Sequence, residues 1–104
     1  MAAKLRQVQS AGGFASVLVK GHDQAGAINL ILRLRDGTLK RAVPGIASDE
    51  GKVDRHFEWR DDLANDTALT AHVERERKFD CDQWFIECEC SKDQFESIFD
   101  VKPL

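Results

Sequence analysis

The sequence predicts an α+β fold, with an antiparallel or mixed sheet of about five strands and helices packed mainly on one face. Several segments alternate apolar and polar residues or are rich in β-branched residues, which is typical of strands. Other segments repeat apolar residues at helical spacing, and Asp36-Gly37 between two strand-like segments is typical of a hairpin turn. The 104 residues, of which 42% are hydrophobic and 32% charged, are expected to form a single domain, 1–104.

The first two predicted elements are a helix and a strand. Residues 3–11 carry apolar side chains on one helical face, and Gly12-Gly13 is expected to end that helix. Residues 14–20 follow as a strand. Because both faces of this strand are apolar, the sequence favours a position inside the sheet over an edge.

A hairpin is predicted next, with strands 27–35 and 38–43 joined by Asp36-Gly37 as a type I′ turn, so that strands 14–20, 27–35 and 38–43 form a meander. That turn places Arg33 opposite Lys40, a like-charge pair, and puts both residues on a solvent face together with Arg35. Leu39 is then expected in the core.

The second half is predicted as a loop (46–54), a strand (55–60), a helix (66–79), a strand (84–90) and a closing helix. Ser91 and Gln94 match a capping box for the closing helix, which Pro103 is expected to end. Because the last strand follows a helix, one parallel pairing is compatible with this order.

Composition narrows the function classes. The formal net charge of −3 and pI near 5.6 supply no global attraction to nucleic acid or anionic lipid. No apolar run is long enough to cross a membrane, so a cytoplasmic location is expected. Cys81, Cys88 and Cys90 are expected as free thiols, with Cys88 and Cys90 in the core, because zinc-site spacing is absent. Neither a metal nor another cofactor is predicted.

Three motifs carry a resemblance to a known family. Ala11-Gly-Gly-Phe-Ala-Ser-Val17, Lys20-Gly-His-Asp-Gln-Ala-Gly-Ala27 and Glu74-Arg-Glu-Arg-Lys-Phe-Asp-Cys-Asp-Gln-Trp84 occur in this order. This pattern, over roughly residues 5–90, resembles short alphaproteobacterial proteins that share domain of unknown function 1491. In that family a short apolar strand precedes the first helix, whereas this chain begins at or after that point. The family also has proline where this chain has Cys81, and it brings no assigned activity.

Two segments are candidate binding sites. The loop Lys20–Gly26 has His22 and Asp23 between two glycines and Lys20 before the first of them, which suits an anion, although a simple connecting turn is the favoured interpretation. The second segment, which ends the helix 66–79, contains Arg75, Arg77 and Lys78. These cations suit a docking partner anchored by Trp84, although a structural helix-to-strand corner is favoured.

The leading functional hypothesis is a non-enzymatic binding or protein-interaction module, because no nucleophile motif, metal spacing or phosphate loop is present. One alternative is a small hydrolase or transferase that uses His22 and Asp23, or a thiol activity of Cys81. Another is nucleic-acid binding by Arg33, Arg35 and Lys40, which the absence of interleaved aromatic residues disfavours. A homodimer is a further option, if Trp59, Phe85 or Phe99 is exposed.

Overall fold

The structure is a computed structural model that describes residues 2–22, 27–45 and 56–102. Its elements, in chain order, are α1 (Ala2–Ser10), β1 (Phe14–Val19), β2 (Ile28–Arg33), β3 (Leu39–Pro44), β4 (Phe57–Leu63), α2 (Asp66–Phe79), β5 (Trp84–Glu89), α3 (Lys92–Phe99) and β6 (Val101–Lys102). Two predictions lie outside the described residues: the loop 46–54 and the end of the closing helix at Pro103.

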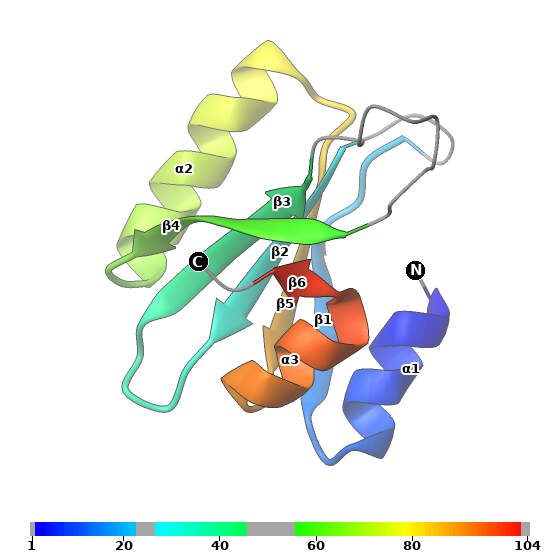
Figure 1. Ribbon diagram of the computed structural model, residues 1–104. Coiled ribbons are helices and arrows are strands. Elements are labelled where there is room, and N and C mark those ends of the chain that lie inside the picture. Colours follow the sequence, from blue (N-terminus) through cyan, green and yellow to red (C-terminus); the bar gives the residue numbers. More distant parts are fainter. Residues whose placement is uncertain (1, 23–26, 46–55, 103–104) are drawn as a thin grey trace.

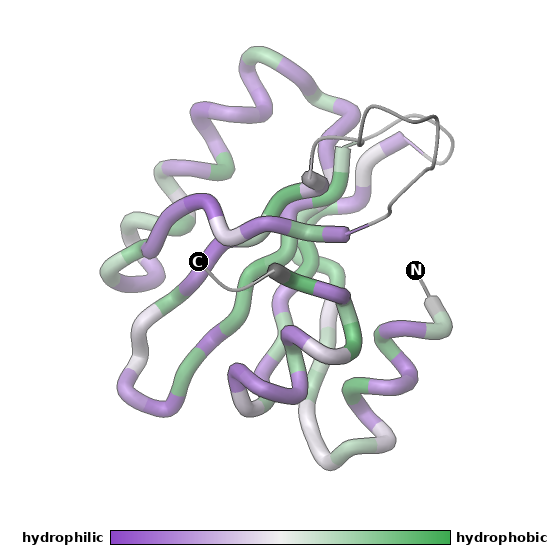
Figure 2. The backbone as a smooth tube through the Cα atoms, viewed as in Figure 1, coloured by the Kyte–Doolittle hydropathy of each residue, from purple (hydrophilic) through white to green (hydrophobic). Residues whose placement is uncertain are grey.

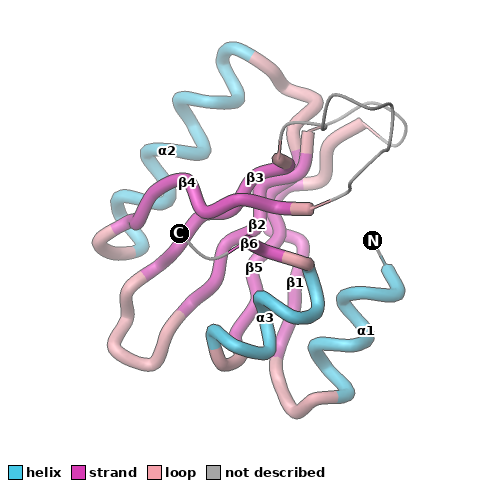
Figure 3. The backbone as a smooth tube through the Cα atoms, in the orientation of Figure 1, coloured by secondary structure: helices cyan, strands magenta, loops and turns pink. Residues whose placement is uncertain are grey.

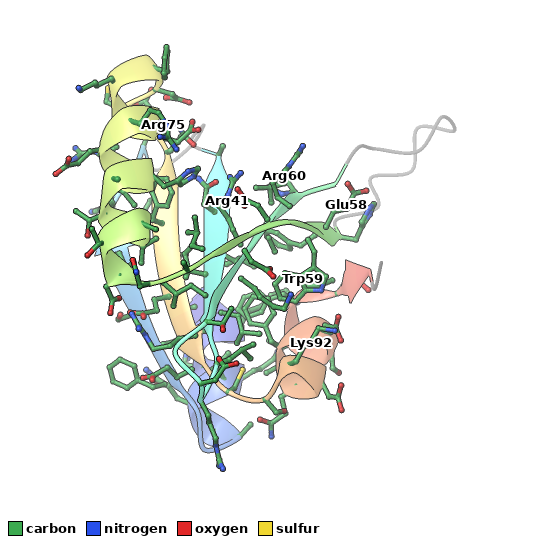
Figure 4. The ribbon with its side chains drawn as sticks, turned by 90° about the vertical axis from the view of Figure 1, so that its left-hand side faces the viewer. Arg41, Glu58, Trp59, Arg60, Arg75 and Lys92 are labelled. Atoms are coloured by element: carbon green, nitrogen blue, oxygen red, sulfur yellow. The ribbon has the colours of Figure 1, made fainter. Side chains whose placement is uncertain are left out.

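The strands form one mixed sheet in the order β1-β5-β2-β3-β4-β6 (Figure 1). Helices α1 and α3 pack on one face, here called the α1/α3 face, and α2 packs on the other, the α2 face (Figure 4). Figure 4 shows Trp59 on the side of α3 and Arg41 on the side of α2. The α+β prediction is confirmed, with two of the three helices on one face.

β5 lies between β1 and β2, antiparallel to the former and parallel to the latter. The predicted meander is therefore wrong, since β1 does not pair with β2, and the predicted interior position of residues 14–20 is also wrong, since β1 is an edge strand. β5 takes the interior because both of its faces are buried. Phe85 is buried on the α2 face, and Ile86 and Cys88 are buried on the α1/α3 face.

The β2–β3 hairpin differs from the predicted type I′ turn by one residue. Gly37 N donates to Leu34 O (3.0 Å), Leu34 N donates to Thr38 O (2.9 Å), and Gly37 has a φ of 90°. This is a type I turn followed by a glycine in the left-handed region, which joins strands by three residues rather than two. Leu39 consequently lies opposite Arg33, and Lys40 opposite Leu32.

The one-residue difference moves side chains to the other face, because successive strand residues point to opposite sides. Leu39 packs with Ile31 and Leu69 on the α2 face, whereas Lys40 shares the α1/α3 face with Leu32. The predicted Arg33–Lys40 pair does not exist, and neither does a common solvent face for these two cations.

The larger core lies on the α1/α3 face, where apolar residues of the strands meet both helices (Figure 2). Phe95 and Phe99 of α3 are fully buried, and the Trp59 ring stacks on Phe95 with centroids 5.3 Å apart. Trp59 Nε1 donates to Glu96 Oε2 (2.9 Å), which fixes the indole ring. Phe85 and Phe99, considered above as exposed dimer contacts, are buried.

The predicted helix boundaries agree well with the structure. The Asn65 side chain accepts a hydrogen bond from Ala68 N at the start of α2, and Ser91 with Gln94 forms the capping box of α3. Gly12, with a φ of 87°, follows the end of α1 as predicted. Phe79, the last residue of α2, is 84% exposed because the last turn of α2 lies beyond the residues that pack on the sheet.

A layer of buried polar groups lies between α2 and the sheet. Asn29 Nδ2 donates to Gln83 Oε1 (3.1 Å), and Arg41 Nη1 donates to Asn29 Oδ1 (3.0 Å). His72 is also buried and meets the Phe85 ring edge-on, but its Nε2 has no hydrogen-bond partner among the described residues. Burial lowers the pKa of His72, and the Arg41 and Arg75 cations lower it further against the opposing effect of Glu76 and Asp61.

The turn geometry predicts the effect of changing Gly37. Replacement of Gly37 by Ala should lower the free energy of unfolding by about 1 kcal/mol, because a Cβ disfavours the left-handed conformation. Gly37→Asn should cost less, since asparagine tolerates that region. Urea unfolding of both variants measures this, and equal stability of the Ala variant and the parent would contradict the described turn.

Buried, neutral His72 predicts a pH-dependent stability. The unfolded chain binds a proton at His72 below about pH 6.5, whereas the folded chain takes it up only at lower pH. The free energy of unfolding should therefore fall as the pH drops below that value, down to the lowered folded-state pKa. His72→Leu should show a smaller fall in urea titrations from pH 7.5 to 5. A fall as large as that of the parent would show that His72 is not the cause.

Candidate functional site

The first predicted binding segment, the loop after β1, meets the connection that follows the second segment, the end of α2, at one end of the sheet. The loop after β1 and the connection from α2 to β5 lie side by side (Figure 3), and His22 N donates to Asp82 O (3.0 Å). Trp84 Nε1 donates to His22 O (2.9 Å). Gly21 permits this approach, because a Cβ there would lie 2.1 Å from Asp82 O. The loop after β1 therefore contacts the turn and the strand start that follow α2.

We use the name basic end for the five exposed basic residues of this loop and of the end of α2: Lys20, His22, Arg75, Arg77 and Lys78. Asp23, the remaining predicted site residue, lies outside the described residues. Within the described part of the chain, the four lysines and arginines of the basic end form no ion pair. Trp84 is half-buried, and its indole nitrogen donates a hydrogen bond to the His22 backbone. Its role is therefore structural, at the connection between α2 and β5.

Arg33 and Lys40, considered above with Arg35 as an alternative nucleic-acid surface, lie on different faces of the sheet. Arg33 lies beneath α2, where its Nε is 2.5 Å from Glu87 Oε1 and its Nη2 is 2.5 Å from Asp66 Oδ1. These two carboxylates raise the pKa of Arg33, and Arg33 in turn lowers the pKa of Asp66. Lys40 pairs with Asp62 at 3.0 Å on the opposite face. Cross-strand and helix–strand ion pairs therefore neutralise these cations.

The thiols show no metal-binding arrangement. Cys88 is fully buried, and burial raises its pKa to about 12, which keeps it protonated as a small core residue. Cys81 is exposed. In residues 2–22, 27–45 and 56–102, no cluster of three or more His, Cys, Asp or Glu side chains is placed to hold a metal ion. The helices of these same ranges include none with the length and hydropathy of a membrane span.

Exposed apolar side chains gather on β1, where the sequence predicts an interior strand. Of the four large apolar side chains that are exposed among the described residues, three lie on this strand: Phe14 (56%), Val17 (46%) and Leu18 (41%). We call these three residues the β1 edge. The signal in the sequence is the apolar character of both faces of residues 14–19, which by itself predicts an interior strand.

A groove of about 500 Å³ adjoins the β1 edge on the α2 face. Its apolar walls are Leu18 and Val19 of β1 and Leu69 and Val73 of α2. Its polar lining residues are Arg33, Asp66, Thr70, Glu74 and Glu87. We call this space the β1 groove. The ion pairs of Arg33 with Asp66 and Glu87 link the start of α2 to the sheet. They hold the α2 wall of the groove in place at this end.

Solved structures of related proteins share this fold. Protein Atu0922 from A. tumefaciens, determined in solution, is 35% identical, with a TM-score of 0.80 over 98% of this chain and 91% of that one. An NMR structure of a DUF1491 family protein from Caulobacter crescentus is 26% identical, with a TM-score of 0.72 over 98% and 91%. A crystal structure of a DUF1491 family protein from the same organism is 29% identical, with a TM-score of 0.64 over 86% and 81%.

Comparison with curated proteins finds no match. The family model described as protein of unknown function (DUF1491) matches residues 1–97. This match spans every element from α1 to β5 and most of α3. The chain therefore belongs to the DUF1491 family, whose function is unknown.

Proposed function

We propose that this chain is a non-enzymatic protein-interaction module of the bacterial cytoplasm that binds through the β1 edge and the β1 groove. One observation carries the proposal: three of the four exposed large apolar side chains among the described residues lie on a strand at the border of the sheet. Free cysteines support the reducing compartment. A group of exposed large apolar side chains is one mark of an interaction site in soluble proteins.

β1 lacks most features that protect a sheet edge. An edge strand presents backbone N–H and C=O groups that another strand can pair with, and proteins block this with charges, prolines or bulges. No residue from Phe14 to Val19 is charged or a proline. A bulge between Val17 and Val19 is the one protective feature on this strand. The segment before the bulge is therefore available for strand addition.

The β1 groove adds selectivity to strand addition. An added strand would project every second side chain toward the α2 face, beside Leu18 and close to the apolar wall from α2. Glu74, Asp66 and Glu87 outnumber Arg33 among the charged residues of the groove. The β1 groove thus favours apolar side chains, and it favours a cation over an anion at its polar side.

The basic end is a second candidate surface, supported by a different observation. Its lysines and arginines are exposed and form no ion pair within the described residues, so an acidic partner would meet them without displacing an internal carboxylate. The same experiment separates this surface from the β1 edge.

Affinity capture from the native cytosol with matched baits tests the proposal. Leu18→Lys places a charge on the edge at a side chain that is 41% exposed, and Arg75→Glu/Arg77→Glu reverses charge at the basic end. A stoichiometric partner of the parent protein should be reduced at least tenfold on the Leu18→Lys bait and retained on the double variant. The reverse pattern would assign binding to the basic end, and retention on both baits would refute both surfaces.

A further inference from the structure

We propose that the partner of the β1 edge is a second copy of this chain, joined by antiparallel β1–β1 pairing about a two-fold axis at Ser16. This inference rests on the proposed function and specifies its partner. A two-fold dimer uses the same patch on both copies, so the patch must be complementary to itself. The positions of the β1 side chains meet that requirement.

The two faces of β1 are fixed by its pairing with β5. Phe14 and Ser16 lie opposite Glu89 and Glu87, on the α2 face, and Leu18 lines the β1 groove on that same face. Ala15 and Val17 lie opposite Cys88 and Ile86, on the α1/α3 face. Directly opposed residues of an antiparallel pair point to the same side, so the two-fold axis must pass through a residue and not between two residues.

An axis at Ser16 matches the exposed side chains with each other. Phe14 of one copy then lies opposite Leu18 of the other, and Val17 lies opposite Ala15, so all three exposed residues gain an apolar neighbour. An axis at Ala15 would place Leu18 opposite Gly12, and an axis at Val17 would place Phe14 opposite Lys20. Only the Ser16 axis covers the whole β1 edge.

Charges favour the same arrangement. The paired segments carry no charge, so no like charges oppose each other. Lys20 lies beyond the end of this pairing, on the side where α1 of the other copy ends. α1 has no basic residue in its last turn, and a cation near a helix carboxyl end is stabilising. The second copy therefore brings a cation toward the carboxyl end of this helix.

The bulge sets the length of the pairing. Because regular pairing of β1 with β5 is interrupted after Val17, pairing between copies centres on residues 15–17, and the Phe14–Leu18 pairs close its two ends at the bulge. Such a short strand pair belongs to the smaller class of interfaces, so a weak, concentration-dependent dimer is expected.

Cysteine cross-linking tests the position of the axis. Ser16→Cys, in a Cys81→Ser/Cys90→Ser background, places two thiols opposite each other at a separation that suits a disulfide. Mild oxidation should yield a covalent dimer much faster than it does for the matched control Thr67→Cys, an exposed position on α2. Equal rates for the two positions would overturn the inference.

Charge pairs test the register independently of any disulfide. Phe14→Lys/Leu18→Lys opposes like charges across the axis, whereas Phe14→Glu/Leu18→Lys opposes unlike charges and removes the same apolar side chains. In sedimentation equilibrium, the dimer dissociation constant should be at least tenfold weaker for the first variant than for the second. Within one chain the ranking is opposite, because residue 14 lies opposite Glu89, so a difference in folding would not mimic the expected result.

The outcomes also separate the inference from the proposed function. A parent protein that stays monomeric at every concentration, but loses a captured partner on Leu18→Lys, would overturn the second-copy assignment and leave the edge as a site for another protein. A monomer with no edge-dependent partner would refute both.

Discussion

The insertion of β5 between β1 and β2 is the constraint on which the rest of the structure depends. β5 joins residues 14–19 to residues 28–33, which no other strand connects in the described sheet. It also contributes to both faces, with Phe85 toward α2 and Ile86 and Cys88 toward the larger core. The sheet is thus completed by a strand far from its neighbours in sequence, and β1 is left at the border.

The same pairing explains why the basic residues of the hairpin do not make a basic surface. β5 carries Glu87 alongside β2, two residues after Phe85, within reach of Arg33. The other carboxylate of this cluster comes from the first turn of α2, where a negative charge also suits the helix dipole. Arg33 is partly buried, and its two carboxylate partners link the first turn of α2 to the sheet. Its charge is therefore used within the fold and is not offered to a ligand.

Local signals in the sequence predicted local structure well. The capping residues Asn65, Ser91 and Gln94 mark helix starts through hydrogen bonds within a few residues, and both helices begin where these residues predict. The predicted register of the hairpin was wrong by one residue, because Asp36-Gly37 is compatible with two types of turn. Only the backbone angles distinguish these two types. Strand order and the meeting of the loop after β1 with Asp82 depend on long-range pairing, which periodicity does not encode.

The error about β1 has a more informative cause. Apolar residues on both faces of a strand indicate that both faces are covered, and within one chain this means an interior position. Pairing between two copies at Ser16 would satisfy the same pattern, because β1 would then lie inside a continuous sheet with apolar neighbours on both sides. On this view the physical interpretation of residues 14–19 applies to the assembly, and a strand that is at the border of one chain carries the composition of an interior strand.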